Sequence, residues 1–235
     1  MDNIGKKLVA EFMGSMFLVM ASVAPIILFS VVMESDPALA LLANALAVAF
    51  VLFALIEIFG SISGAFFNPA VTFAMLLHKD ICGRRTALYI PVQIAGGITG
   101  IILCHVMFFD EVGYLLTMAD KTRGGYQFVA EIIGTFVLVF TILMLCKRQS
   151  SKTALIVSLL VGGQILATSS TMFANPQVTI ARMFTATPSG IQPADAAVFV
   201  GMQLVGAGMA YGVVRLIFPH PKSEARLLEA VKKEK

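Results

Sequence analysis

The chain has 235 residues, of which 58% are hydrophobic and only 13% are charged, and its mean hydropathy is +0.88. Soluble domains carry about 25% charged residues, so this composition excludes an ordinary soluble protein and indicates that most of the chain lies in lipid. The formal net charge of +3 gives little support for a nucleic-acid partner.

Six apolar stretches predict six membrane-spanning helices, because about 20 residues at about 1.5 Å each cross a hydrocarbon core of about 30 Å. The stretches are residues 8–32, 39–60, 86–109, 127–146, 153–173 and 196–218. The first stretch follows Lys6 and Lys7, but it is long for a signal peptide and lacks a small-residue cleavage site. It is therefore expected to remain in the protein as an anchor.

Lysine and arginine residues predict the orientation, because cytoplasmic loops retain them. Six crossings place both termini on one side. The basic residues on that side are Lys6, Lys7, Lys79, Arg84, Arg85, Lys147, Arg148, Lys152, Lys222, Arg226, Lys232, Lys233 and Lys235. The opposite side carries only Lys121, Arg123 and Arg182. Both termini are therefore expected in the cytoplasm, with residues 219–235 forming a short charged tail on the membrane surface.

Two halves of the chain resemble each other. The segment AEFMGSMFLV at Ala10 matches AEIIGTFVLV at Ala130, and PVQIAGG at Pro91 resembles GMQLVGA at Gly201. Each half, residues 5–109 and 125–218, holds three predicted spans. An odd number of crossings forces the second half to enter the membrane from the opposite face, so the sequence predicts one transmembrane domain built as an inverted repeat, with a site between the halves at the midplane.

Two short segments, FFNPAVTFAML and FANPQVTIARM, occupy equivalent places in the two halves. Asn68 and Asn175 are suitable N-caps, and Pro69 and Pro176 suit the first helical position. Each segment extends over about ten residues, which is about 15 Å of helix or half the hydrocarbon thickness. The segments are therefore predicted to be half-helices that enter from opposite faces and begin near the midplane.

The paired Asn-Pro segments, the six spans, and the Glu early in the first and fourth spans resemble the aquaporin or major intrinsic protein family over nearly the whole chain. The resemblance implies an all-α membrane protein with six transmembrane helices and two re-entrant half-helices. It also implies a homotetramer in lipid with one pore per subunit, and a passive channel for water or small uncharged solutes such as glycerol.

The Asn68 and Asn175 carboxamides are expected to donate hydrogen bonds to solute at the midplane, where the positive ends of both half-helices repel cations. A water molecule that accepts from both amides cannot also accept from its neighbour, which interrupts a proton wire. Glu11 and Glu131 lie inside predicted spans, where a carboxylate needs partners. They are interpreted as acceptors for the backbone N–H groups of the re-entrant loops; a proton relay is the alternative.

The outer constriction departs from the family pattern. Val178 stands where most relatives have Arg, and family spacing gives Val48, Met172, and either Gly163 or Gln164 as the other walls, with no aromatic residue among them. Gly163 would leave the neck apolar, whereas Gln164 would add a polar wall.

Arg182 lies one turn beyond Val178 on nearly the same helix face. Two placements remain open for it. Arg182 reaches the place that the family arginine leaves, or it extends to the outer headgroups and pairs with Asp110, Glu111 or Asp120.

Phe66 stands where the family usually has His. Together with Val178 and the NPxVTxAR run, this departure resembles a bacterial subgroup linked to arsenic detoxification, in which the solute is neutral arsenous acid. The resemblance implies a prokaryotic cell-membrane protein.

Three further sets of residues are interpreted as structural. The pairs Gly96 with Gly100 and Gly208 with Gly212 are expected to let helices approach closely. Glu57 has no counterpart in the repeat and lies on the helix face opposite Val48. If Val48 faces the pore, Glu57 faces lipid or a neighbouring subunit, and we expect it at a contact between subunits. The cysteines are expected to pack rather than to bind metal, and they are Cys82, Cys104 and Cys146.

Other classes of function are weaker. A secondary transporter also uses inverted repeats and broken helices, but it needs an ionisable coupling site that faces the pathway. A membrane adhesion or scaffold protein with a vestigial pore is a further alternative. An enzyme is not expected, because no nucleophile with a base, no metal site and no cofactor motif is found in the sequence.

Overall fold

The computed structural model describes residues 4–219. Over that range the secondary structure is helical and contains no strand. The all-α fold expected from the sequence is thereby observed, whereas the predicted tail over residues 219–235 lies almost entirely outside the described residues.

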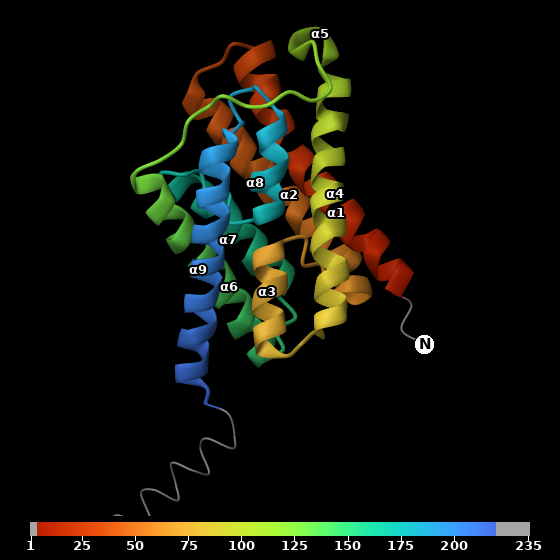
Figure 1. Cartoon of the computed structure of the whole chain (residues 1–235), viewed down its shortest axis with the longest axis vertical. Helices are drawn as coiled ribbons and strands as arrows, with labels where there is room; N and C mark the ends of the chain where they lie inside the picture. Colours follow the sequence, from red (N-terminus) through yellow and green to blue (C-terminus); the bar gives the residue numbers. More distant parts are fainter. Residues whose placement is uncertain (1–3, 220–235) are drawn as a thin grey trace, which may run out of the picture.

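The first half of the chain contains a long helix, a second long helix, a short helix and a third long helix (Figure 1). Their bounds are α1 Ile4–Ile27, continued by a π-helical turn at Leu28–Val32, α2 Pro37–Ser63, α3 Pro69–His78, α4 Gly83–Met107 and the single turn α5 Phe109–Val112. The second half repeats this order. Its elements are α6 Tyr126–Arg148, α7 Thr153–Ala167, α8 Pro176–Ala181 with the 3-10 turn Arg182–Phe184, and α9 Pro193–Ile217.

Five of the helices in the described part of the chain are long and apolar enough to cross a membrane, and α7 is shorter. It has 15 residues and ends at Ala167, six residues before the predicted end of the fifth span. The polar residues after Ala167 explain the early end, because the Thr168 hydroxyl bonds back to the Gln164 carbonyl and Thr171 adopts a positive φ of 59°. The chain then turns into the second Asn-Pro loop.

The two halves pack in the same way. Helix α1 packs against α4, and α6 packs against α9, while α2 contacts both α1 and α7. The half-helices α3 and α8 both contact α4 and α9, with α8 in the upper part of the bundle and α3 in the lower part (Figure 1). Their N-termini therefore approach each other between the halves, as an inverted repeat requires.

Glycines allow the closest of these contacts. A Cβ on Gly96 would overlap the Phe12 carbonyl oxygen, and one on Gly206 would overlap the carbonyl oxygen of Ile132. The prediction for the second glycine pair was wrong within the subunit, because a Cβ on Gly208 or Gly212 would meet no atom within 4 Å. Gly206, two positions earlier, makes the contact between α6 and α9.

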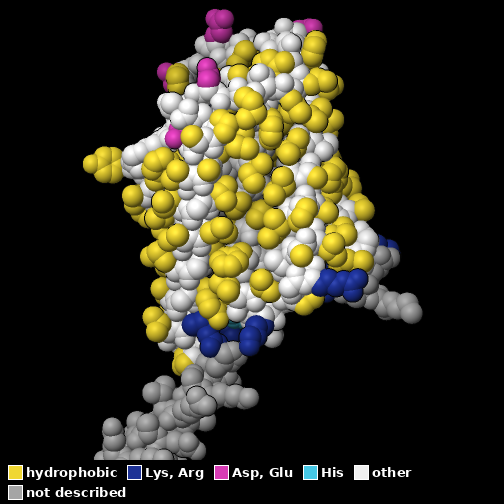
Figure 2. All heavy atoms as spheres, in the orientation of Figure 1, with side chains coloured by type: hydrophobic (Ala, Val, Ile, Leu, Met, Phe, Trp, Pro, Cys, Tyr) yellow, Lys and Arg dark blue, Asp and Glu magenta, His cyan; other side chains and the backbone are white. Residues whose placement is uncertain are grey.

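The surface is divided along the long axis of the molecule. Figure 2 shows hydrophobic side chains over the middle of the visible face, Lys and Arg side chains gathered at its lower end, and Asp and Glu side chains at its upper end. Charges confined to the two ends leave an apolar belt between them, which suits a chain that crosses a membrane.

Candidate functional site

The two Asn-Pro pairs begin α3 and α8 as predicted from their cap chemistry. The Asn68 Oδ1 accepts hydrogen bonds from the backbone N–H of Ala70 at 2.8 Å and of Val71 at 3.4 Å. The Asn175 Oδ1 accepts from the backbone N–H of Gln177 at 3.1 Å. Both Asn residues have extended backbones and are followed by Pro at the first helical position.

Each cap also bonds to the opposite loop. The Asn68 Nδ2 donates to the carbonyl of Ala174 at 2.8 Å, and the Asn175 Nδ2 donates to the carbonyl of Phe67 at 2.9 Å. A carboxamide has two N–H donors, so one donor on each Asn remains. Both Asn side chains line the cavity.

The loops that precede the caps are strained. Phe67 has a φ of 48° and Ala174 has a φ of 44°, although both carry side chains. A left-handed residue other than glycine costs about 1 kcal/mol or more, so both conformations need support. The crossed hydrogen bonds give one part of it, since the Phe67 and Ala174 carbonyls are the ones that the two Asn side chains bind.

Two buried carboxylates also support the strained loops that precede the caps. Glu11 accepts from the backbone N–H groups of Phe66 at 3.1 Å and Phe67 at 2.8 Å. Glu131 accepts from the backbone N–H groups of Phe173 at 2.9 Å and Ala174 at 2.8 Å. These contacts have the geometry expected of acceptors for the re-entrant loops.

A glutamine and a threonine extend each carboxylate contact. The Gln93 amide donates to Glu11 at 2.8 Å and to the hydroxyl of Thr72 in α3 at 3.0 Å. The Gln203 amide donates to Glu131 at 2.6 Å and to the hydroxyl of Thr179 in α8 at 2.8 Å. No role was predicted for these residues, although both repeated segments contain them. Their equivalence in the two halves is the signal that could have found them.

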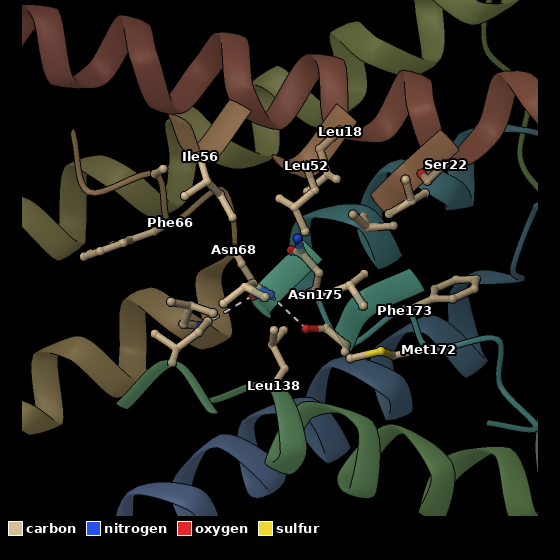
Figure 3. A pocket seen from close by; sticks show the side chains of 18 of the residues that line it. Leu18, Ser22, Leu52, Ile56, Phe66, Asn68, Leu138, Met172, Phe173 and Asn175 are labelled. Carbon is tan, nitrogen blue, oxygen red and sulfur yellow. Dashed lines mark hydrogen bonds between the residues drawn. The ribbon is translucent and has the colours of Figure 1, made fainter. Parts of the chain in front are cut away.

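The cavity beside the caps has a volume of about 480 Å³. Most of its wall is apolar, with Leu18, Leu52 and Leu138 close to the Asn pair (Figure 3). Ile56 and Phe66 lie on one side of the pair, whereas Ser22, Met172 and Phe173 lie on the other (Figure 3).

The predicted walls of the neck are placed as follows. Val48, Met172 and Val178 line the cavity, but neither Gly163 nor Gln164 does. Gly163 is exposed, with open space beyond its Cα. The cavity wall from α7 consists of Thr153, Val157, Val161 and Ile165, which recur every fourth residue and so share one helix face. The family spacing was therefore out of register on this helix.

Arg182 is on the cavity wall and is only 5% exposed. Its Nη2 donates to the Ser22 carbonyl at 2.6 Å, and its guanidinium carbon lies 4.2 Å from the centroid of the Phe173 ring. Within residues 4–219, no ion pair joins Arg182 to the acidic residues of the outer loop. The second of its two predicted placements is thus not the one observed.

An aromatic residue is present in the neck after all. Phe173 lines the cavity, and the guanidinium of Arg123 lies 4.6 Å from its ring centroid, in addition to that of Arg182. Arg123 is held by the carbonyls of Gly190 at 3.2 Å and Ser170 at 3.3 Å. Burial lowers the pKa of Arg123 to about 10, so this guanidinium stays charged at neutral pH.

Comparison with known proteins gives a family and a fold. Residues 2–174 match the family described as Major intrinsic protein. The chain is 38% identical over 214 residues to Aquaglyceroporin AqpS of Rhizobium meliloti (strain 1021), an alignment that covers 91% of this chain and 90% of AqpS. It is 33% identical over 143 residues to Probable aquaporin PIP2-6 of Oryza sativa subsp. japonica, covering 58% of this chain and 51% of that protein.

The X-ray structure of the aquaglyceroporin from Plasmodium falciparum is similar with a TM-score of 0.71, and the similarity covers 92% of this chain and 98% of the other. At 16% sequence identity this likeness concerns the fold, which agrees with the predicted bundle and its two half-helices. The family match over residues 2–174 and the 38% identity to AqpS over most of both chains show that this chain belongs to the major intrinsic protein family.

Proposed function

We propose that this protein is a passive channel for water and small uncharged solutes. The observation that carries the proposal is the pair of Asn side chains, which cap two half-helices from opposite halves, bond across to each other's loops, and line one cavity. A solute that leaves bulk water loses hydrogen bonds. A few donors beside an apolar wall replace some of those bonds without trapping the solute.

We propose that ions are excluded at the same pair of Asn residues. Each half-helix carries about half a positive charge at its N-terminus, and both N-termini are directed toward the Asn pair. A cation would meet this field after losing its hydration. Glu11 and Glu131 add no opposing group on the cavity wall, because their oxygens accept from backbone and glutamine N–H groups behind the loops.

The solute range follows from the neck. AqpS, a relative at 38% identity, is named an aquaglyceroporin, and we extend the class of small polyols to this chain. Val48, Met172 and Val178 give apolar walls, while Arg182 gives a polar one. Arsenous acid, a small uncharged molecule with hydroxyl groups, would pass through such a neck for the same reason as glycerol.

A secondary transporter is the rival. Alternating access would need an ionisable group that faces the pathway and changes partners. Glu11 and Glu131 are both fully buried, and their hydrogen bonds hold the loops on which the Asn pair depends. These contacts suit carboxylates that support the loops better than carboxylates that couple ion binding to transport.

The proposal also covers the oligomeric state and the orientation in the membrane. We infer a homotetramer in the cell membrane with both termini in the cytoplasm, in keeping with the basic end of the molecule (Figure 2). Glu57, which is exposed on α2, is assigned to the contact between subunits.

Stopped-flow light scattering on proteoliposomes tests the function directly. Water, glycerol and arsenous acid would be compared with empty liposomes of the same lipid. A channel gives flux that is linear in the gradient and does not saturate. Flux that saturates and depends on an ion gradient would support the transporter instead.

A further inference from the structure

The two half-helices differ at their second residue. Ala70 follows the first Asn-Pro pair, whereas Gln177 follows the second, and both residues are fully buried. An alanine side chain needs no hydrogen bond, but a buried carboxamide needs partners for its two N–H groups and its oxygen. Gln177 therefore has bonding requirements that its counterpart in the first half does not have. No role was predicted for Gln177 from the sequence.

The Gln177 side chain lies against α4 at Gly97. Helix α8 packs against α4, and a Cβ on Gly97 would overlap the Gln177 Oε1. In the other half α3 packs against α9, and the repeated segments PVQIAGG and GMQLVGA align Gly97 with Ala207. The first half-helix thus combines alanine with alanine, whereas the second combines glutamine with glycine. The glycine leaves the room that the longer side chain occupies.

The carboxamide of Gln177 reaches across to the first loop. Its Nε2 donates to the Phe67 carbonyl at 3.3 Å, while its Oε1 has no hydrogen-bond partner within residues 4–219. The same carbonyl accepts from the Asn175 Nδ2 at 2.9 Å, so two donors use the two lone pairs of the Phe67 oxygen. The equivalent carbonyl of Ala174 accepts from Asn68, and the alanine that follows that Asn-Pro pair has no side-chain donor to add.

The Phe67 carbonyl sets the direction of the Asn175 amide, because one N–H of that amide is bound to it. Phe67 has a left-handed backbone. Glu11 accepts from its N–H group, which leaves the carbonyl to be fixed by the second half of the chain. The Gln177 bond is longer than the usual limit of about 3.2 Å, but it comes from a fully buried side chain with little room to turn. Without it, the carbonyl and the Asn175 amide could turn together.

We propose that Gln177 is a positioning residue of the pore, which fixes the Phe67 carbonyl and thereby the direction of the Asn175 amide. Gly97 is the glycine that admits its side chain. The inference rests on the proposed channel function and deepens it. A water molecule at the midplane interrupts a proton wire only while it accepts from both Asn68 and Asn175, so the direction of the Asn175 amide bears on proton exclusion.

The test uses the purified full-length protein in liposomes, with water permeability measured by light scattering and proton permeability by a pH-sensitive dye. Gln177→Met keeps the length of the side chain and removes its donor. We expect proton permeability above the leak of empty liposomes to rise about threefold to tenfold, which is what one hydrogen bond is worth in a rate. Water permeability should stay within about twofold of wild type. Unchanged proton permeability in a folded Gln177→Met protein overturns the proposal.

Gln164→Met is the matched control, because it makes the same substitution on α7 at a residue that does not line the cavity. Both permeabilities should equal those of wild type in this variant. A rise in proton permeability as large as that of Gln177→Met would show that the effect does not depend on the Phe67 carbonyl, and it would overturn the proposal.

Substitutions at Gly97 separate positioning from packing. Gly97→Ala places a methyl group where the Gln177 Oε1 lies, so the carboxamide is pushed away from Phe67. We expect a lower unfolding temperature in detergent and a rise in proton permeability like that of Gln177→Met. Adding Gln177→Ala removes the overlap and gives the second half the two alanines of the first. The unfolding temperature should then return toward the wild-type value, while proton permeability stays high.

The double variant Gly97→Ala/Gln177→Ala therefore gives a result that packing alone would not give. Wild-type proton permeability in this protein would show that Gln177 only fills space, and it would overturn the proposal. The same variant decides the question if Gln177→Met does not fold, because two alanines leave neither an overlap nor an unpaired carboxamide. A wild-type protein that passes water no faster than empty liposomes would instead refute the channel function.

Discussion

At the scale of single residues, Glu131 shows how much of the site depends on one side chain. Both of its oxygens accept from backbone N–H groups of the second loop, and one of them also accepts from Gln203. Ala174, one of the loop residues, is in a left-handed conformation and offers its carbonyl to Asn68. The donor geometry of the pore is therefore set by a carboxylate that never meets the solute.

Glu131→Gln should destabilise the protein, although it is nearly isosteric. An amide turns one acceptor into a donor, which would then face an N–H group that needs an acceptor. We expect a loss of about 1 to 3 kcal/mol, seen as a lower unfolding temperature in detergent, with a parallel loss of water permeability. Glu34→Gln is the control, because Glu34 is exposed in the turn after α1. Equal unfolding temperatures for the two variants would contradict the supporting role of Glu131.

At the scale of helices, local chemistry proved easier to predict than helix register. The starts of α3 and α8 were predictable because the cap and the proline act on their own neighbours. The face that α7 turns to the cavity was not, since an error of one or two residues replaces Ile165 with Gln164 or Gly163. Phe173 was missed for a related reason, because its position depends on the path of a strained loop.

The glycine pairs also show what the sequence could not predict. Spacing alone could not distinguish a glycine that meets another backbone from one that meets open space. Gly96 faces the backbone of α1, whereas Gly208 has nothing nearby in the subunit. Both belong to small-residue pairs in the sequence, so only the packed helices reveal which pair lets two helices approach.

Gly96→Ala and Gly208→Ala form a matched pair that tests this assignment. The added methyl on Gly96 would overlap the Phe12 carbonyl oxygen, and backbone cannot move aside as a flexible side chain can. We expect Gly96→Ala to cost about 1 to 3 kcal/mol, and Gly208→Ala to change stability by less than about 0.5 kcal/mol. Thermal unfolding of both variants in one detergent measures the difference. If Gly96→Ala lost as little stability as Gly208→Ala, the result would show that α1 and α4 can move apart at little cost.

At the scale of the whole molecule, the apolar belt and its charged ends account for insertion but leave one group unexplained. Glu57 is exposed on α2, among the large apolar side chains Phe53 and Ile58, which are also exposed. A carboxylate that faces lipid at depth costs at least about 2.5 kcal/mol. Within residues 4–219 it has no hydrogen bond or ion pair, so a neighbouring subunit is the natural source of its partner.

Glu57→Gln should therefore alter the stability of the proposed tetramer more than that of the subunit. An amide has a different set of hydrogen-bond donors and acceptors from a carboxylate, so the temperature at which the proposed tetramer dissociates in mild detergent should shift. Asp110→Asn is the control, because Asp110 is exposed at the outer end and loses its charge without touching the belt. Native mass spectrometry over a range of temperature measures the dissociation. Identical profiles for Glu57→Gln and wild type would place Glu57 outside the contact between subunits.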